Sequence, residues 1–131
     1  MLSRTAENLY WTGRYMERAE TMARLLSVGY RLAMVPSAGP TGHHNEWTPI
    51  LAAAGVAEGF GEKFSDPPFQ RDAETWLFFD HDNPSSVASS LERARNNARA
   101  VRTAVSTDMW EALNSAYIEF RALERQPRST L

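Results

Sequence analysis

The sequence predicts an all-α protein: an antiparallel helical bundle with two long helices, a C-terminal helix and one or two short helices in the insert between the long ones. Three observations indicate this class. Apolar residues recur at helical spacing over most of the 131 residues. No stretch alternates convincingly between polar and apolar residues, and prolines and glycines gather between the periodic segments. We expect residues 1–131 to form a single domain, because a chain of this length is large enough for one core.

The first long helix is expected from residue 4 to residue 34, with Ser3 as its N-cap. Trp11, Tyr15, Met22 and Leu26 lie on one apolar arc of this helix, which is broad enough to contact more than one neighbour. The aromatic residues are expected in the core, including all four tryptophans: Trp11, Trp47, Trp76 and Trp110.

An insert separates the two long helices. Its prolines and glycines predict a loop from Val35 to Trp47 and a break from Lys63 to Pro68. Short helices are expected from Trp47 to Ala57 and from Phe69 to Phe79, where apolar residues return at helical spacing.

The second long helix is expected from residue 84 to residue 104, because Asn83-Pro84 gives an N-cap followed by proline at the first helical position. Ser106 caps a last helix, from Thr107 to about Leu123, and the residues from Gln126 onward are expected to fray. The second long helix carries one narrow apolar stripe, and the last helix carries an aromatic inner face. These consist of Val87, Leu91, Ala94, Ala98, Val101 and Val105, and of Trp110, Leu113, Tyr117 and Phe120.

Charge and composition exclude several classes of protein. The net charge of −2 argues against nucleic-acid binding, and the absence of cysteine excludes disulfides and thiolate chemistry. No apolar run is long enough for a membrane span, and Arg4 and Glu7 interrupt any signal sequence, so we expect a cytoplasmic protein. Residues 1–34 carry +2, residues 35–82 carry −6 and residues 83–102 carry +3, which favours charge pairing within the chain.

Two segments share the pattern apolar-Glu-Arg-Ala-x-x-x-Ala-Arg: Met16 to Arg24 and Leu91 to Arg99. The pattern is consistent with a duplicated helical hairpin or with coincidence between two helices rich in alanine and arginine. Small alanines four residues apart would let the two segments pack closely.

The stretch from Glu7 to Glu20, ENLYWTGRYMERAE, resembles the opening of the bacterial alpha-E family, an all-helical domain named for a Glu-Arg motif. The blocks from Asp82 to Arg102 and from Met109 to Asn114 continue the resemblance in the family's order. Members are usually more than twice this length, so the chain resembles their N-terminal half. The resemblance implies association with an ATP-grasp-like carboxylate–amine ligase, in a setting of peptide synthesis, modification or tagging.

Arg18 is anomalous because it falls inside the apolar arc of the first helix, where an unpaired charge costs several kcal/mol, roughly. Either it forms an interhelix salt bridge or it binds an anion such as a peptide carboxylate. Arg14 lies at the edge of the same arc. Glu17 lies on the polar side and owes its interest to the resemblance.

Arg95, Arg99 and Arg102 form a second ridge of like charges, which repel one another unless acidic residues face them. We expect a half-buried network of arginine and glutamate, with Glu7, Glu17 and Glu111 as candidate partners. Arginines of this ridge without protein partners would instead mark an anion pocket.

The histidines His43, His44 and His81 lie in loops without a third ligand at regular spacing, so no metal and no cofactor are predicted. Together with the resemblance to alpha-E domains, these features imply a non-catalytic partner domain of the ligase system, which binds a partner protein or a peptide carboxylate. Its candidate binding residues are Arg14, Glu17, Arg18, Arg95, Arg99 and Arg102. The alternatives are part of an enzyme active site that uses the Glu/Arg cluster, and a self-associating interaction domain.

Overall fold

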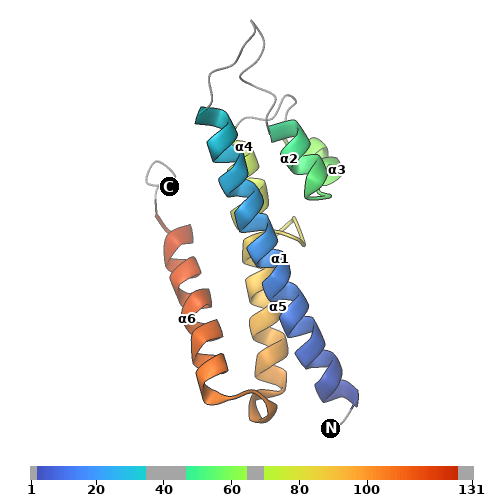
Figure 1. Cartoon of the computed structure of the whole chain (residues 1–131), viewed down its shortest axis with the longest axis vertical. Coiled ribbons are helices and arrows are strands. Elements are labelled where there is room, and N and C mark those ends of the chain that lie inside the picture. The colour runs from blue at the N-terminus through green and yellow to red at the C-terminus, as the bar shows by residue number, and fades with distance from the viewer. Residues whose placement is uncertain (1–2, 35–46, 65–69, 127–131) are drawn as a thin grey trace, which may run out of the picture. The chain divides into compact units, whose positions relative to one another are not determined.

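Every regular element among the described residues is helical. The structure, a computed structural model, describes residues 3–34, 47–64 and 70–126. In chain order the elements are α1 (Ser3–Met34), α2 (Trp47–Ala53), α3 (Ala57–Lys63), α4 (Gln70–Glu74), a π-helical turn (Thr75–Phe79), α5 (Val87–Ala100), a 3₁₀ turn (Arg102–Ala104) and α6 (Thr107–Glu124) (Figure 1). The all-α prediction is confirmed. Helix α3 was not predicted, because Gly59 and Gly61 lower the helix propensity of that segment.

Three predictions fall wholly or partly on residues that the structure does not describe. These are the loop at 35–46, most of the break before Pro68, and the fraying of residues 127–131. They stay predictions.

Contacts within the chain divide it into two compact units. We name residues 1–18 and 90–131 the terminal unit, and residues 19–89 the middle unit. Helices α1 and α5 each run through the boundary between them. The expectation of a single domain stays a prediction.

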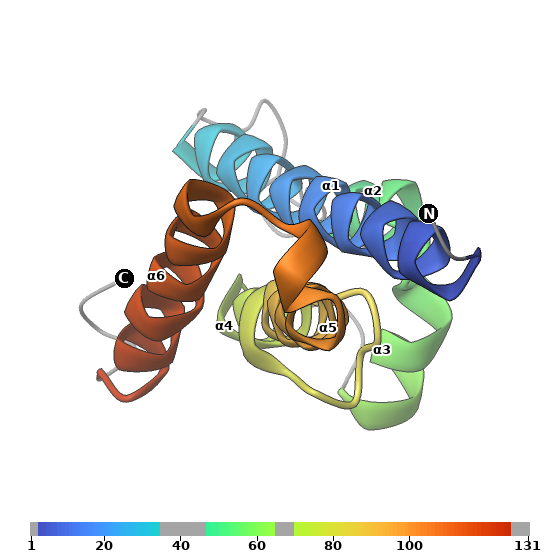
Figure 2. The ribbon, with the colours of Figure 1, turned by 90° about the horizontal axis from the view of Figure 1, so that it is seen from below.

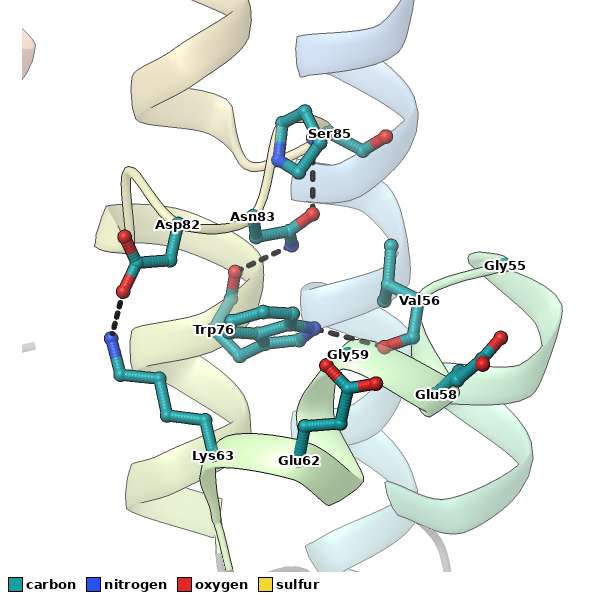
Figure 3. Close-up of a pocket in the computed structure, with 11 residues that line it drawn as sticks. Gly55, Val56, Glu58, Gly59, Glu62, Lys63, Trp76, Asp82, Asn83 and Ser85 are labelled. Atoms are coloured by element: carbon teal, nitrogen blue, oxygen red, sulfur yellow. Dashed lines mark hydrogen bonds and ion pairs between the residues drawn. The ribbon is translucent and has the colours of Figure 1, made fainter.

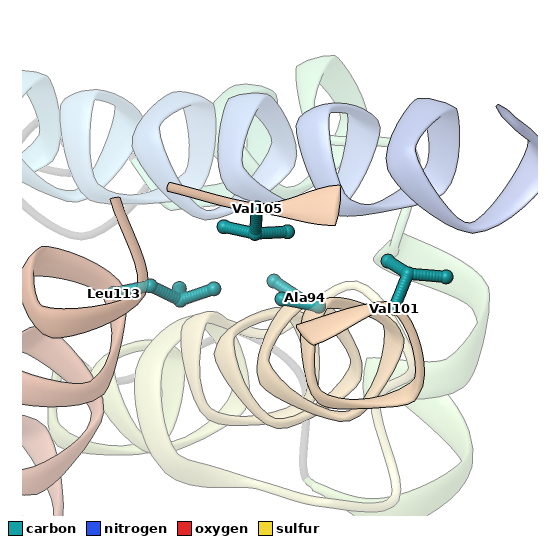
Figure 4. Packing of buried hydrophobic residues seen from close by; sticks show 5 residues of the cluster. Ala94, Val101, Val105 and Leu113 are labelled. Carbon is teal, nitrogen blue, oxygen red and sulfur yellow. The ribbon is translucent and has the colours of Figure 1, made fainter. Parts of the chain in front are cut away.

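The terminal unit packs the first half of α1, most of α5 and α6. Helix α5 runs opposite in direction to both of the others (Figure 1), and the connection from α5 to α6 passes beside α1 (Figure 2). Val101 and Val105 of that connection belong to one buried cluster with Leu113 of α6 and the alanines of α5 (Figure 4). All six residues of the predicted stripe are buried. Val87 to Ala98 lie on α5 as predicted, but α5 ends at Ala100, so the expected helix to residue 104 is too long, and Val101 and Val105 lie beyond its end.

Aromatic rings fill the middle unit. Trp47 is 2% exposed and packs edge-on against Tyr30, with ring centroids 5.9 Å apart. Trp76 is 4% exposed and lies edge-on to Phe60. Two of the four tryptophans are therefore core residues as predicted. Trp11 is 38% exposed, which corrects its assignment to the core, and Trp110 is half-buried.

A serine lies at the start of each of the two later helices, α5 and α6. The Ser106 hydroxyl accepts a hydrogen bond from the Met109 amide at 3.1 Å, which confirms it as the N-cap of α6. Helix α5 begins at Val87, where the Ser86 hydroxyl accepts from the Ser89 amide at 3.1 Å. The prediction that Asn83 caps this helix was wrong. Its side chain accepts from the Ser85 amide and so closes a turn before the helix.

The described ion pairs are local. Arg14 pairs with Glu17, and Arg24 pairs with Glu20, all within α1. Lys63 pairs with Asp80 and Asp82 within the middle unit. None of the described helices is long and apolar enough to cross a membrane.

We predict that two glycines of α1 respond in opposite ways to alanine. A Cβ at Gly29 would overlap the ring of buried Trp47, whereas a Cβ at Gly13 meets nothing within 4 Å. Gly29→Ala should therefore lower the free energy of unfolding by about 1–3 kcal/mol, the usual cost of overpacking. Gly13→Ala should raise it by about 0.5–1 kcal/mol, because alanine favours a helix interior. Urea denaturation of both variants measures this, and a Gly29→Ala protein as stable as wild type would contradict the packing.

We predict that stability falls above pH 10, roughly, partly through Tyr30. Burial, and then the hydrogen bond to Glu74, raise the pKa of Tyr30 well above its usual range. The folded chain therefore keeps a phenolic proton that the unfolded chain loses, so the free energy of unfolding falls as pH rises. One such proton contributes at most about 1.4 kcal/mol per pH unit, and solvent screening of half-buried Tyr30 reduces this. Chemical denaturation between neutral and alkaline pH should show a shallower fall for Tyr30→Phe than for wild type.

Candidate functional site

Two arginines of the predicted ridge stack against aromatic rings of α6. The Arg95 guanidinium carbon lies 4.7 Å from the centre of the Tyr117 ring and 5.8 Å from that of Trp110. Arg102 lies 5.3 Å from the Trp110 ring centre. These distances are within the range of cation–π attraction. We name the set Arg95, Arg102, Trp110, Asn114 and Tyr117 the arginine–aromatic ladder.

A side-chain hydrogen bond orients Arg95 within the ladder. Its Nε donates to Asn114 Oδ1 at 2.9 Å while the guanidinium plane is held near Tyr117. Between described residues the structure records no ion pair of Arg95 or Arg102 with a carboxylate. The two terminal nitrogens of an arginine such as Arg95 form a planar fork, which can bind a carboxylate through two parallel hydrogen bonds. The ladder therefore presents an oriented cation rather than a neutralised one.

The sequence predicted that glutamates would pair with the arginine ridge, whereas in the structure Arg95 and Arg102 contact aromatic rings instead. Of its candidate acidic partners, Glu111 and Glu7 form no ion pair with a described residue, and Glu17 pairs only with Arg14. Arg99 lies exposed on α5, and no described carboxylate pairs with it. Two of the three arginines on the ridge, Arg95 and Arg102, therefore contact aromatic rings of α6.

Arg18 also lies against an aromatic ring, and of its two expected roles the interhelix salt bridge is not found among the described residues. Its guanidinium carbon lies 5.7 Å from the Tyr15 ring centre, and that of Arg93 lies 5.8 Å from the same ring. Arg18 is half-buried and Arg93 is exposed. Aromatic contact allows the Arg18 stem to cover apolar surface while its charge stays near water. This explains how a cation is accommodated on the apolar arc.

Arg14 and Glu17 form an exposed surface pair. The Arg14 Nη1 to Glu17 Oε2 distance is 3.6 Å, and the side chains are 50% and 72% exposed. Pairs of this kind contribute little to stability, about 0–1 kcal/mol. Of the six predicted residues, all of which are described, Arg14 and Glu17 are the pair for which the structure records a direct contact.

Sequence reasoning missed the residues that orient the arginines. Trp110, Asn114 and Tyr117 follow one another at i, i+4 and i+7 along α6, so they share a face of the helix. That spacing was available in the sequence, but the aromatic residues were assigned to the core and Asn114 was not considered. Two aromatic rings and an amide on one face, opposite an arginine ridge, are the signal that could have found the ladder.

The terminal unit also contains an apolar groove of about 420 Å³. Its lining comes from α1, α5 and α6, and Met109 at its edge is 61% exposed. We name it the apolar groove, and its lining is Leu9, Thr12, Gly13, Met16, Ala98, Val105, Met109, Ala112 and Leu113.

The described chain offers little to a metal ion. No group of three or more histidine, aspartate or glutamate side chains within residues 3–34, 47–64 and 70–126 converges as a ligand set. His81 is exposed, and His43 and His44 lie outside the described residues.

Comparison with known proteins identifies the family but not an activity. Residues 1–131 match the Alpha-E family, described as a predicted alpha-helical domain with a conserved ER motif. Glu-Arg occurs in this chain at Glu17-Arg18, Glu92-Arg93 and Glu124-Arg125. No solved structure gives a significant match.

The curated relatives are mycobacterial and much longer. An uncharacterized protein of Mycobacterium bovis and one of Mycobacterium tuberculosis strain CDC 1551 are each 36% identical over 94% of this chain. Another from M. tuberculosis strain H37Rv is 35% identical over the same share. The chain spans 15% of the length of these relatives. The match over all 131 residues, together with the helical fold, shows that the chain belongs to the Alpha-E family.

Proposed function

We propose that this chain is a cytoplasmic, helical partner domain of an ATP-grasp-type amide-ligase or peptide-modification system. In that role the arginine–aromatic ladder binds a carboxylate of a peptide or partner protein. The carrying observation is Arg95, whose Nε is bound to Asn114 and whose terminal nitrogens have no described carboxylate partner.

Arg95 is suited to ligand recognition because its side chain is held in place before a ligand binds. An arginine on a bare surface loses side-chain entropy when it binds, whereas stacking on Tyr117 and the bond to Asn114 have already restricted Arg95. Ring contact also removes some water from the guanidinium, which strengthens a charge-assisted hydrogen bond.

The net charge of the terminal unit supports an acidic ligand. Residues 1–18 and 90–131 contain ten arginines and seven carboxylate side chains, a net of +3 in a chain that is −2 overall. A field of this sign speeds the approach of an acidic peptide and favours its binding at low salt.

The ligase system itself comes from the resemblance to alpha-E domains, which accompany ATP-grasp-like carboxylate–amine ligases. A domain that holds a carboxylate-bearing peptide fits beside an enzyme that joins carboxylates to amines. The enzymatic alternative has less support, because a general acid or base needs a desolvated setting and Glu17 is 72% exposed.

Self-association is a second candidate, and the apolar groove favours it. Met109 at the groove and Tyr10 of α1 are 61% and 59% exposed. Exposed apolar residues beside an apolar groove are typical of surfaces that bind another protein.

We predict that Arg95→Ala weakens binding of a fluorescein-labelled triglutamate peptide about tenfold to a hundredfold, the usual effect of losing charge-assisted hydrogen bonds. Arg95→Lys should lose most of this affinity, because lysine keeps the charge but not the fork. Fluorescence anisotropy at fixed salt measures the affinities. The matched control is Arg4→Ala, which removes an exposed charge from the same unit. An equal loss for Arg4→Ala would show that only the net charge matters and would contradict the ladder.

We also predict that the wild-type chain co-purifies with an ATP-grasp-like ligase from the same genome, and that Arg95→Ala reduces the amount retained. Arg18→Ala, which removes the contact with Tyr15, should have a smaller effect. Failure of the wild-type chain to retain the ligase would contradict the proposed system, while leaving carboxylate binding by the ladder intact.

A further inference from the structure

The middle unit contains a polar pocket of about 610 Å³ that no part of the proposed function uses. It lies between α3, the π-helical turn and the turn that precedes α5 (Figure 3). Its volume is in the range of small-molecule sites. The lining residues that matter here are Val56, Glu58, Glu62, Lys63, Trp76 and Asp82.

Hydrogen bonds fix one wall of the pocket. Trp76 Nε1 donates to the Val56 carbonyl at 3.0 Å, and Asn83 Nδ2 donates to the Trp76 carbonyl at 2.7 Å. Gly59 allows α3 to approach the indole, since a Cβ there would lie 2.7 Å from Trp76 Cζ2. Trp76 and Asn83 are 4% and 1% exposed, so this wall is preformed rather than assembled by a ligand.

The lone cation of the pocket lining is already neutralised. Lys63 Nζ donates to Asp80 Oδ2 at 2.7 Å and to Asp82 Oδ2 at 2.9 Å. These bonds raise the pKa of Lys63, and the ammonium lowers the pKa of Asp82, so Lys63 and Asp82 stay charged at neutral pH. Two carboxylates around one ammonium leave an excess negative charge.

Two more carboxylates line the pocket without a described partner. Glu58 and Glu62 lie one turn apart on α3, and the Glu62 carboxylate points from the helix into the pocket (Figure 3). Between described residues the structure records no hydrogen bond or ion pair for either. With Asp82 and Lys63, the charged side chains that line the pocket sum to −2.

We propose that this pocket binds a primary ammonium group attached to an apolar body. The unpaired carboxylates of Glu58 and Glu62 would hold the ammonium, and the Val56 and Trp76 side would face the apolar body. A bare metal ion fits less well, because no three acidic or histidine side chains of the described chain converge on one point. Both the amino terminus of a peptide and an alkylamine, such as a lysine side chain, have this chemistry.

The test is an NMR titration of the full chain, which follows the Trp76 indole N–H. The probes are leucine amide and hexylamine, with N-acetyl-leucine amide as the uncharged control. Both amines should shift the resonance saturably, and the acetylated compound should not. Tighter binding of leucine amide would identify a peptide amino terminus as the ligand, and tighter binding of hexylamine would identify an alkylamine.

Exposed carboxylates are partly screened, so we expect Glu62→Gln to weaken amine binding about threefold, and Glu58→Gln with Glu62→Gln about tenfold. Glu7→Gln in the terminal unit is the matched control and should leave binding unchanged. The proposal is overturned if the acetylated compound binds as well as the amines, if neither amine binds, or if Glu7→Gln weakens binding as much as Glu62→Gln. None of these results bears on the arginine–aromatic ladder.

Discussion

The contact between guanidinium groups and aromatic rings is the interaction on which the terminal unit depends. Arg18, Arg95 and Arg102 are half-buried, where a bare charge would be costly. Rings at Tyr15, Trp110 and Tyr117 supply a negative face that partly replaces water. An ion pair would occupy the hydrogen-bond donors of an arginine, so that they could not bind a partner. An aromatic ring leaves these donors available. Stability and recognition are therefore compatible at the same residues.

Much of the fold could be predicted because the relevant signals are local or periodic. The stripe from Val87 to Ala98 follows directly from helical geometry, and the Ser106 cap follows from one side chain and one amide three residues on. The prediction for Asn83 was wrong because the same side-chain oxygen can form either an N-cap or an Asx turn. Which of the two forms depends on Trp76, whose carbonyl accepts a hydrogen bond from Asn83 Nδ2.

The candidate site was less predictable because its contacts link residues far apart in the chain. A helical wheel places Arg18 beside Tyr15, three residues earlier on α1, but cannot show whether a carboxylate from another helix pairs with Arg18. Likewise, the hydrophobicity of Trp11 and Trp110 indicates burial, whereas their actual exposure depends on which helices cover them. The middle-unit pocket needed the positions of three separate segments, none of which carries a recognisable motif.

The π-helical turn at Thr75–Phe79 constrains where this chain can gain or lose a residue. Here the Asp80 amide bonds back to the Thr75 carbonyl, five residues earlier, so the turn holds one residue more than an α-helix would. Deletion of a single residue would restore ordinary helical pitch and rotate everything beyond it by about 100°. Asn83 would then no longer face Trp76, and the pocket wall would be lost. Insertions and deletions should thus be tolerated elsewhere in the insert before they are tolerated here.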